Sequence, residues 1–324
     1  MFRAVGLLII WGLLQASAQA AEPYPSRPIT LVIPYAAGSD TDVIGRMLGS
    51  LTHPDMNARA PVFENRTGAS GLTASLWVRA AAPDGYTLLI ARVGTHAIAP
   101  AIEVKRPYDQ DEFTTLAILS TNPLICAVRK DSPYKTSRDL LAAIRQQPGK
   151  LKYGTSGAGT IQNLAAQYLL ALGGLKPEAA KVRYSTSGAT ATEDLVNGHV
   201  DFVCNNANTV LPGMQAGKLR GLFTTAPARM TQAPDLLTAR EAGLRDMVQI
   251  QGWTALMGPA KLPAEVTSKW KTVLAKLAKD PQWLAGNIQL GAQSALLNVK
   301  DPEKFVRDQY VLYDQLITTQ GLRQ

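Results

Sequence analysis

The sequence predicts an α/β protein of two lobes, each built on a mostly parallel sheet flanked by helices, with strands that cross between the lobes. Residues 21–122 alternate strand-like and helix-like segments, and residues 123–225 repeat that alternation. No low-complexity linker separates the two halves, and 324 residues suit two domains better than one. We therefore expect lobe 1 to comprise 21–122 and 226–324, and lobe 2 to comprise 123–225.

The first half opens on a strand that ends at a turn of small residues. The segment ITLVIPY (29–35) is rich in β-branched residues, and Ala-Ala-Gly-Ser (36–39) follows it. Asp40, Thr41 and Asp42 are each suited to cap the next helix, whose apolar residues fall on one face. The segments PVFEN, GASGLTASLWVRAAA and YTLLIARV then predict a strand, a helix and a strand.

The second half repeats this order. Strands are predicted at PLICAVR, KLKYGTSG, KVRYSTSG and VDFVCNN, and helices at SRDLLAAIRQ, TIQNLAAQYLLALGG and TATEDLVNGH. The segment KLRGLFTTA predicts a further strand, for which a return to the first sheet is one option. From residue 258 onward the pattern is helical, and a long helix is expected from about Pro302 to Gln320.

The first twenty residues have the pattern of a secretory signal peptide. Arg3 is the only charge before Glu22, and residues 4–14 form an apolar run too short to span a bilayer. Ala18 and Ala20 have the spacing of a cleavage site, so we expect residues 1–20 to be removed and the protein to be exported. Cleavage would lower the formal charge from +8 to +7. The remaining basic residues are scattered, which argues against a nucleic-acid partner.

Two cysteines, Cys126 and Cys204, both lie in apolar strand-like segments. An exported protein can form a disulfide from such a pair. Cysteine also packs as a small apolar residue, so two buried thiols are the alternative. The sequence does not decide between them, because the outcome depends on the distance between the two Cα atoms.

Three turns share one design: each follows a strand, precedes a helix and consists of Gly, Ala, Ser and Thr. They span residues 36–39, 155–160 and 185–190. Small side chains let a ligand approach the backbone, and the first N–H groups of a helix have no partner within the helix. The helix dipole favours an anion at that end. Gly-rich turns also occur for steric reasons alone, but three of one kind favour an anion site at the carboxyl ends of the strands.

Catalytic and metal motifs are missing from the sequence. GTSGAG lacks the Gly-Lys ending of a phosphate-binding loop, and Ala158 stands where a nucleophile elbow needs glycine. Of the three histidines, only His96 follows a strand closely enough to contact a ligand. We expect His53 and His199 to lie at the surface. Glu193 and Asp194 lie on a helix that we expect to face solvent. We therefore expect no enzyme activity, no cofactor and no metal.

The order of motifs resembles the tripartite tricarboxylate transporter substrate-receptor family, the Bug-type periplasmic solute-binding proteins. The segments concerned are YPSRPITLVIPYAAGSDTDVIGRML, VFENRTGASGLTAS, APDGYTLLIA, GTHAIAPAI, PYDQDEF, KYGTSGAGT, VNGHVDFVC and EAGL. The resemblance runs over the chain from about Tyr24 to the C-terminus. The resemblance implies the two-lobed periplasmic-binding-protein fold, closing by hinge motion over one small ligand in the periplasm of a Gram-negative cell.

The resemblance also implies a ligand class, a partner and a set of binding residues. The ligand would be a small organic acid, delivered to a membrane permease of one large and one small subunit. The turn of lobe 1 would contact the distal part of the ligand, and the loops of lobe 2 would hold a carboxylate. Carried onto this sequence, the lobe 1 role falls on Tyr35, Ala36, Ala37, Gly38 and Asp42, and the segment after the third strand adds Thr95 and His96. The lobe 2 role falls on Ser156, Gly157, Gly159, Thr160, Ser187, Gly188 and Ala189.

The sequence departs from the family pattern at three places. The usual glycine pair of the first turn is Gly38-Ser39, the third turn carries additional hydroxyl groups, and Asn205 stands where an acidic residue is common. Asn205 removes one negative charge near the ligand, which argues against an amino-acid ligand and favours a purely anionic or uncharged one.

Two other functions share the same sequence features. A Ser-dependent α/β hydrolase would need a serine such as Ser156 beside a histidine, and only His96 is a candidate. A sensor that presents its ligand to a membrane kinase would use the same binding chemistry as a transport receptor. We expect a monomer in either case.

Overall fold

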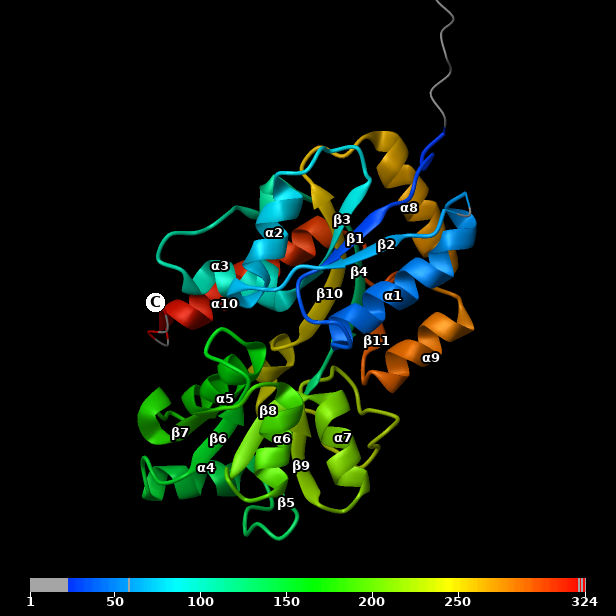
Figure 1. Cartoon of the computed structure of the whole chain (residues 1–324). Coiled ribbons are helices and arrows are strands. Elements are labelled where there is room, and N and C mark those ends of the chain that lie inside the picture. The colour runs from blue at the N-terminus through cyan, green and yellow to red at the C-terminus, as the bar shows by residue number, and fades with distance from the viewer. Residues whose placement is uncertain (1–22, 58, 320, 322, 324) are drawn as a thin grey trace, which may run out of the picture.

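The computed structural model describes residues 23–57, 59–319, 321 and 323, and the predicted signal peptide lies outside them. The chain forms two α/β lobes, one above the other in Figure 1, with the C-terminal helix in the same lobe as the first strand. The predicted α/β class and two-lobed architecture are confirmed.

Lobe 1 contains a six-stranded sheet in the order β11-β4-β10-β3-β1-β2. Its strands are β1 (Thr30–Ile33), β2 (Val62–Asn65), β3 (Thr87–Arg92), β4 (Phe113–Asn122), β10 (Gly252–Pro259) and β11 (Gln293–Ser294). Strand β1 pairs in parallel with β2 and β3, whereas β10 is antiparallel to both β3 and β4, and β11 is antiparallel to β4. Four strands therefore run in one direction and β10 and β11 in the other, so the sheet is mixed.

Helices cover both faces of this sheet. They are α1 (Asp40–Thr52), α2 (Leu72–Arg79), α3 (Ala99–Ile102), α8 (Ala264–Leu277), α9 (Pro281–Gln289) and α10 (Pro302–Thr319). Successive residues of a strand point to opposite faces. Ile33 of β1 accordingly packs in the same apolar cluster as Ile44 of α1 and Trp270 of α8. Its neighbour Val32 belongs to the cluster of Val78 and Tyr313, from α2 and α10.

Helix α1 begins one residue earlier than the sequence indicates. Ser39 is the N-cap, because its Oγ accepts a hydrogen bond from the Asp42 amide at 3.3 Å. The predicted caps Asp40, Thr41 and Asp42 lie inside the first turn instead. Serine is as good a cap as aspartate, so the local sequence did not distinguish them.

Lobe 2 contains a five-stranded sheet in the order β7-β6-β8-β5-β9. Its strands are β5 (Leu124–Arg129), β6 (Lys152–Thr155), β7 (Lys181–Tyr184), β8 (Phe202–Asn206) and β9 (Leu219–Thr224). Its helices are α4 (Ser137–Gln146), α5 (Ile161–Leu172), α6 (Gly188–Val196) and α7 (Ala207–Gln215). Only β5 runs against the other strands. The segment KLRGLFTTA does not return to the first sheet, since it forms β9 and pairs with β5.

The two cysteines form a disulfide inside lobe 2. Cys126 on β5 lies directly opposite Cys204 on the antiparallel strand β8, with the Cα atoms 3.9 Å apart. Both residues are completely buried. The pairing register thus settles the choice that the sequence left open.

The lobes are joined where β4 passes through Pro123 into β5 and where the chain enters β10, after Ala226, Met230 and Leu236 have packed in the apolar cluster of lobe 2. The two crossings lie side by side, because Asn122 and Gly252 are register partners. The start of β5 and the end of β9 are also joined by hydrogen bonds. The Leu124 amide donates to Thr225 Oγ1 at 2.9 Å, and the Thr225 amide donates to the Leu124 carbonyl at 2.9 Å. Strands β4 and β10, which flank this region, lie outside the elements predicted from the sequence.

Candidate functional site

The carboxyl ends of the parallel strands of each sheet point toward the other lobe. The loops after β1, β2 and β3 face the N-terminal ends of α5, α6 and α7 (Figure 1). The lobes touch here, because Asn208 Nδ2 of α7 donates to Asp40 Oδ1 of α1 at 3.0 Å. A methyl group on Gly159 would lie 3.6 Å from Ile102 and 3.9 Å from Ser70 Oγ. All the residues predicted to bind the ligand lie in or beside these loops.

The lobe 1 turn is held in place by the carboxylate of Asp42. This side chain accepts hydrogen bonds from the Gly38 amide, Arg46 Nε and Asn65 Nδ2, each at 2.9 Å. Asn65 also donates to the carbonyl of Tyr35. Burial raises the pKa of Asp42, but the hydrogen bonds from Arg46, Gly38 and Asn65 outweigh it and keep that pKa below its usual value. Asp42 therefore shapes the turn, while Ala36, Ala37 and Gly38 remain exposed.

A strained backbone segment lies beside this turn. Ala69 and Ser70 both have positive φ, 45° and 54°, and they lie between Gly68 and Gly71, which also have positive φ. Non-glycine residues rarely adopt this conformation, and such strain gathers at ligand-binding sites. The Tyr35 hydroxyl donates to the Ser70 carbonyl at 3.4 Å. The glycines that bracket Ala-Ser were the available sequence signal, but no residue of this segment was among those predicted to bind the ligand.

Thr95 and His96 lie in a π-helical turn (Gly94–Ile98) after β3, and both side chains are completely buried. His96 Nδ1 and Thr95 Oγ1 are 2.9 Å apart, and the ring packs against Tyr108 and Phe113. Its Nε2 has no hydrogen-bond partner among the described residues. Burial lowers the pKa of His96 to about 3, so the imidazole is neutral at physiological pH.

The first lobe 2 turn is organised by Thr160, the N-cap of α5. Its hydroxyl donates to the Gly157 carbonyl at 2.7 Å and accepts from the Asn163 amide at 3.4 Å. Gly157 has φ +150°, which other residues rarely adopt. The Ala158 carbonyl accepts from Asn163 Nδ2 at 3.0 Å. These bonds fix the loop, while Ser156, Gly157 and Gly159 stay half-buried at its surface.

The second lobe 2 turn is capped by Ser187 and supported from below by Asn205. Ser187 Oγ accepts from the Thr190 amide at 3.1 Å. Asn205 is only 1% exposed; its Nδ2 donates to the Gly188 carbonyl at 2.6 Å and to Thr192 Oγ1 at 3.0 Å. A methyl group on Gly188 would lie 2.9 Å from Asn205 Oδ1. Asn205 thus positions the start of α6, which also carries the exposed Ala189.

The expectation that Asp194 faces solvent is wrong. Its carboxylate accepts hydrogen bonds from Arg183 Nε at 3.0 Å and from Ser185 Oγ at 2.6 Å, and His199 Nδ1 lies 3.0 Å away. These hydrogen bonds, chiefly from Arg183 and Ser185, lower the pKa of Asp194 to about 2. Asp194 fastens the end of β7 to α6, and its neighbour Glu193 is the one that is exposed.

The helix ends of the two lobes differ in charge. The first turn of α1 contains Asp40 and Asp42, whose carboxylates offset the positive end of its dipole. The first turns of α5 and α6 contain no acidic residue. An anion between the lobes is therefore favoured at the lobe 2 helix ends, where unpaired N–H groups, the helix dipole and the Ser and Thr hydroxyls act together.

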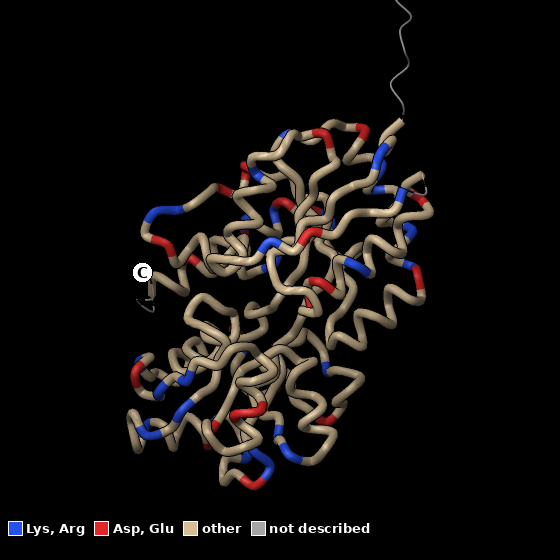
Figure 2. The backbone as a smooth tube through the Cα atoms, viewed as in Figure 1, with Lys and Arg blue, Asp and Glu red and all other residues tan. Residues whose placement is uncertain are grey.

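One basic residue at this edge was missed by the sequence analysis. Arg92 is the last residue of β3 and is 8% exposed. A charged residue that ends an apolar strand was its only signal. Elsewhere, Lys and Arg residues are spread over both lobes rather than gathered on one face (Figure 2).

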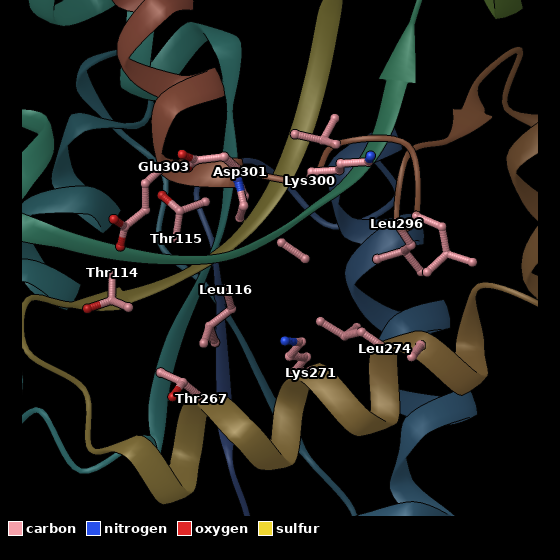
Figure 3. Close-up of a pocket in the computed structure, with 15 residues that line it drawn as sticks. Thr114, Thr115, Leu116, Thr267, Lys271, Leu274, Leu296, Lys300, Asp301 and Glu303 are labelled. Carbon is pink, nitrogen blue, oxygen red and sulfur yellow. The ribbon is translucent and has the colours of Figure 1, made fainter.

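A surface pocket of about 650 Å³ lies apart from the lobe junction. Its walls come from the start of β4, from α8 and from the segment that leads into α10, including Thr114, Lys271 and Lys300 (Figure 3). None of the predicted binding residues lines it. Within the described part of the chain, no group of three or more His, Cys, Asp or Glu residues could hold a metal ion. No helix in that part is long and apolar enough to cross a membrane.

Two α/β lobes joined by adjacent crossings, with helix N-terminal ends that carry no acidic residue facing the opposite lobe, define the class of two-lobed solute-binding proteins. Within this class, residues 53–322 match the model of the tripartite tricarboxylate transporter family receptor. The chain belongs to this family, which confirms the resemblance seen in the sequence motifs.

Individual relatives agree with this assignment. BugT from Bordetella pertussis is 29% identical over 260 residues, covering 78% of each chain. The structure of MatC from Rhodopseudomonas palustris with bound malate is 26% identical, with a TM-score of 0.77 over 91% of this chain and all of that one. A second R. palustris protein, solved with adipate, is 25% identical, with a TM-score of 0.78 over 92% of this chain and 98% of that one.

Proposed function

We propose that this chain is an exported receptor that binds a small carboxylate between its lobes, without chemical change, and delivers it to the permease of a tripartite tricarboxylate-type transporter. The observation that carries the proposal is the pair of helix ends, α5 and α6, that lack acidic residues and face lobe 1. Malate and adipate in two structural relatives are ligands of the same chemical class.

The strength of such a site is sufficient for a receptor. A hydrogen bond to a charged group contributes about 1.5–3 kcal/mol. Four of them would supply on the order of the 8 kcal/mol that corresponds to micromolar affinity, before the cost of association is subtracted. The binding residues we propose are those predicted from the sequence in the loops of both lobes. Asp42 and Asn205 act there by shaping the loops.

We propose the first lobe boundary at 122/123, as predicted, with hinge motion at the two crossings. The division of the strands between the two sheets supports this boundary and a second one between β9 and β10. The packing of Ala226, Met230 and Leu236 with lobe 2 favours a second boundary later than the predicted 225/226. Contact between Asp40 and Asn208 would form on closure. The periplasmic location, the cleavable signal peptide at 1–20 and the monomeric state belong to the same proposal.

The experiment is a thermal-shift assay of the mature chain with a panel of mono-, di- and tricarboxylates, followed by mass spectrometry of the recovered ligand. We expect at least one acid to raise the melting temperature and to be recovered intact. Native mass spectrometry of freshly purified protein would identify a ligand retained from the cell. Stabilisation by none of the acids would refute the carboxylate receptor.

The hydrolase alternative is tested by the same samples. His96, its only candidate base, is buried and hydrogen-bonded to Thr95, and no hydrogen bond joins it to Ser156 within the described residues. Turnover of an ester that Ser156→Ala abolishes would favour the enzyme over the receptor.

A further inference from the structure

Arg92 is a buried cation without a counter-ion. Its Nη1 donates to Thr254 Oγ1 on β10 at 3.2 Å. In the described part of the chain, no carboxylate comes within ion-pair distance of its guanidinium, whereas Arg46, at the other side of the same lobe edge, is paired with Asp42. Burying a charge is strongly unfavourable unless the charge is paired. The Arg92 guanidinium is therefore expected to pair with an anion that is not part of the described chain.

The residues beside Arg92 form a polar row across the sheet. Arg92 on β3 is the register partner of Thr254 on β10, which in turn is the partner of Ser120 on β4. Register partners share one face of a sheet. Asn122 and Gly252 form the next partnered pair on that face toward lobe 2, two residues away along each strand. Gly252 brings no side chain to this edge, and a methyl group there would lie 4.0 Å from Arg92 Nη2.

Two members of this row carry polar atoms without partners. Ser120 is completely buried and Asn122 is 3% exposed. Ser120 Oγ and Asn122 Oδ1 make no hydrogen bond to any described residue. Buried polar groups are nearly always hydrogen-bonded, and those left unpaired in a native protein commonly mark a ligand or water site. The polar row therefore combines one unpaired cation with two unpaired buried groups at the edge that faces lobe 2.

The polar row is continuous with the proposed binding loops. The Arg92 amide donates to Thr95 Oγ1 at 3.0 Å, and the Thr95 side chain and the Tyr35 hydroxyl both lie beside Gly71. Burial raises the pKa of Tyr35, and the charge of Arg92 opposes that rise. Tyr35 in turn contacts Ser70, which lies next to Gly159 of lobe 2. Arg92 thus stands on the lobe 1 side of the junction, opposite the helix ends of lobe 2.

We propose that Arg92 determines the charge specificity of the receptor: its guanidinium, with Ser120 and Asn122 beside it, binds a second carboxylate of a ligand whose first carboxylate lies at the N-terminal ends of α5 and α6. This inference rests on the proposed function and deepens it from carboxylates in general to ligands with two acidic groups. A monocarboxylate would leave the guanidinium unpaired on closure and would bind more weakly.

The test compares acids of equal chain length that differ by one carboxylate: succinate with butyrate, glutarate with pentanoate and adipate with hexanoate. Affinities are measured by titration calorimetry for the wild type, for Arg92→Met and for the control Arg27→Met. Arg27 is exposed and paired with Asp84, and both lie before the amino ends of β1 and β3, away from lobe 2. We expect the wild type and the control to prefer one diacid over its monoacid by about 10- to 100-fold. Arg92→Met should abolish this ratio.

A melting measurement without ligand separates this role from a structural one. Removing an unpaired buried charge should leave the melting temperature of Arg92→Met unchanged or higher. A fall of several degrees with equal loss of diacid and monoacid binding would show that Arg92 is structural, and would overturn the inference. If Arg92→Met fails to fold, Asn122→Ala provides the second variant, expected to weaken the diacid alone.

The two levels of the proposal fail differently. Equal binding of diacid and monoacid by the wild type would refute the role of Arg92 and leave the carboxylate receptor intact. Binding of neither member of any pair, together with no response in the wider carboxylate panel, would refute the receptor itself.

Discussion

Acidification should destabilise this protein through one buried histidine. His96 is completely buried with a pKa of about 3, whereas histidine in an unfolded chain has a pKa of about 6.5. Between these values the unfolded state binds a proton that the folded state does not. The free energy of unfolding is therefore at its full value above pH 6.5 and falls as the pH is lowered toward 3.

The size of the effect follows from the two pKa values. At pH 5.0 the unfolded chain gains about 2 kcal/mol from protonating this one ring, and near pH 7.5 it gains almost nothing. Asp194, with a pKa of about 2, contributes only at lower pH, because carboxylates in the unfolded chain titrate near 4. The range between pH 7.5 and 5.0 therefore reports mainly on histidine.

The assay is urea denaturation of the wild type and of His96→Gln at both pH values. Glutamine can keep a hydrogen bond to Thr95 but does not titrate. We expect the wild type to lose about 2 kcal/mol more than the variant on going from pH 7.5 to 5.0. Equal losses in the two proteins would refute the claim that His96 is held neutral by burial.

Three further predictions concern the loops and the disulfide of lobe 2. Removing the Cys126–Cys204 bridge, as the double alanine variant, should lower the free energy of unfolding by about 4.5 kcal/mol. This is the loss of chain entropy expected for a loop closed over a sequence separation of 78 residues. Urea denaturation measures the change, and an unchanged free energy of unfolding would contradict this prediction. Gly188→Ala should reduce carboxylate affinity at least about tenfold by calorimetry, because the added methyl group would lie 2.9 Å from Asn205 Oδ1 and shift the start of α6; full affinity would show that this helix end does not contact the ligand. Asn205→Asp should also weaken carboxylate binding, since it replaces the donor to the Gly188 carbonyl with an acceptor and adds a negative charge; unchanged affinity would defeat the idea that an uncharged residue here favours an anion.

The alternation of strands and helices was predictable because each element carries a local signal. An apolar β-branched run predicted β1, the small-residue turns that follow β6 and β7 helped to predict these two strands, and periodic apolar residues predicted α1 and α5. Strand β10 has Gly252 and Pro259 at its ends and pairs antiparallel with two strands far away in the sequence. A local sequence pattern does not predict pairing between strands that are so far apart in the sequence. The same limit left the sheet of β9 open, although its residues were assigned to lobe 2.

The site was predictable where it depends on backbone, and less so where it depends on side-chain partners. Turns rich in Gly, Ser and Thr reveal helix starts that can receive an anion. The roles of Asp194 and Asn205 depend on hydrogen bonds to residues that are distant in the sequence. Asp194 on α6 accepts from Arg183 on β7, and Asn205 on β8 donates to the Gly188 carbonyl at the start of α6. The burial of Arg92 depends on β10, which the sequence did not pair with β3. Three-dimensional neighbours, rather than residue type, decide these roles.

The adjacent crossings make lobe 2 an insertion within lobe 1. The whole five-stranded sheet arises between Asn122 and Gly252, and these two ends of the inserted segment are register partners on β4 and β10. Because these ends already meet, excising the segment and sealing lobe 1 with a short linker would cost little loop-closure entropy. A single proteolytic cut at one crossing would leave the other as a tether, so a nicked molecule would still keep its two halves together.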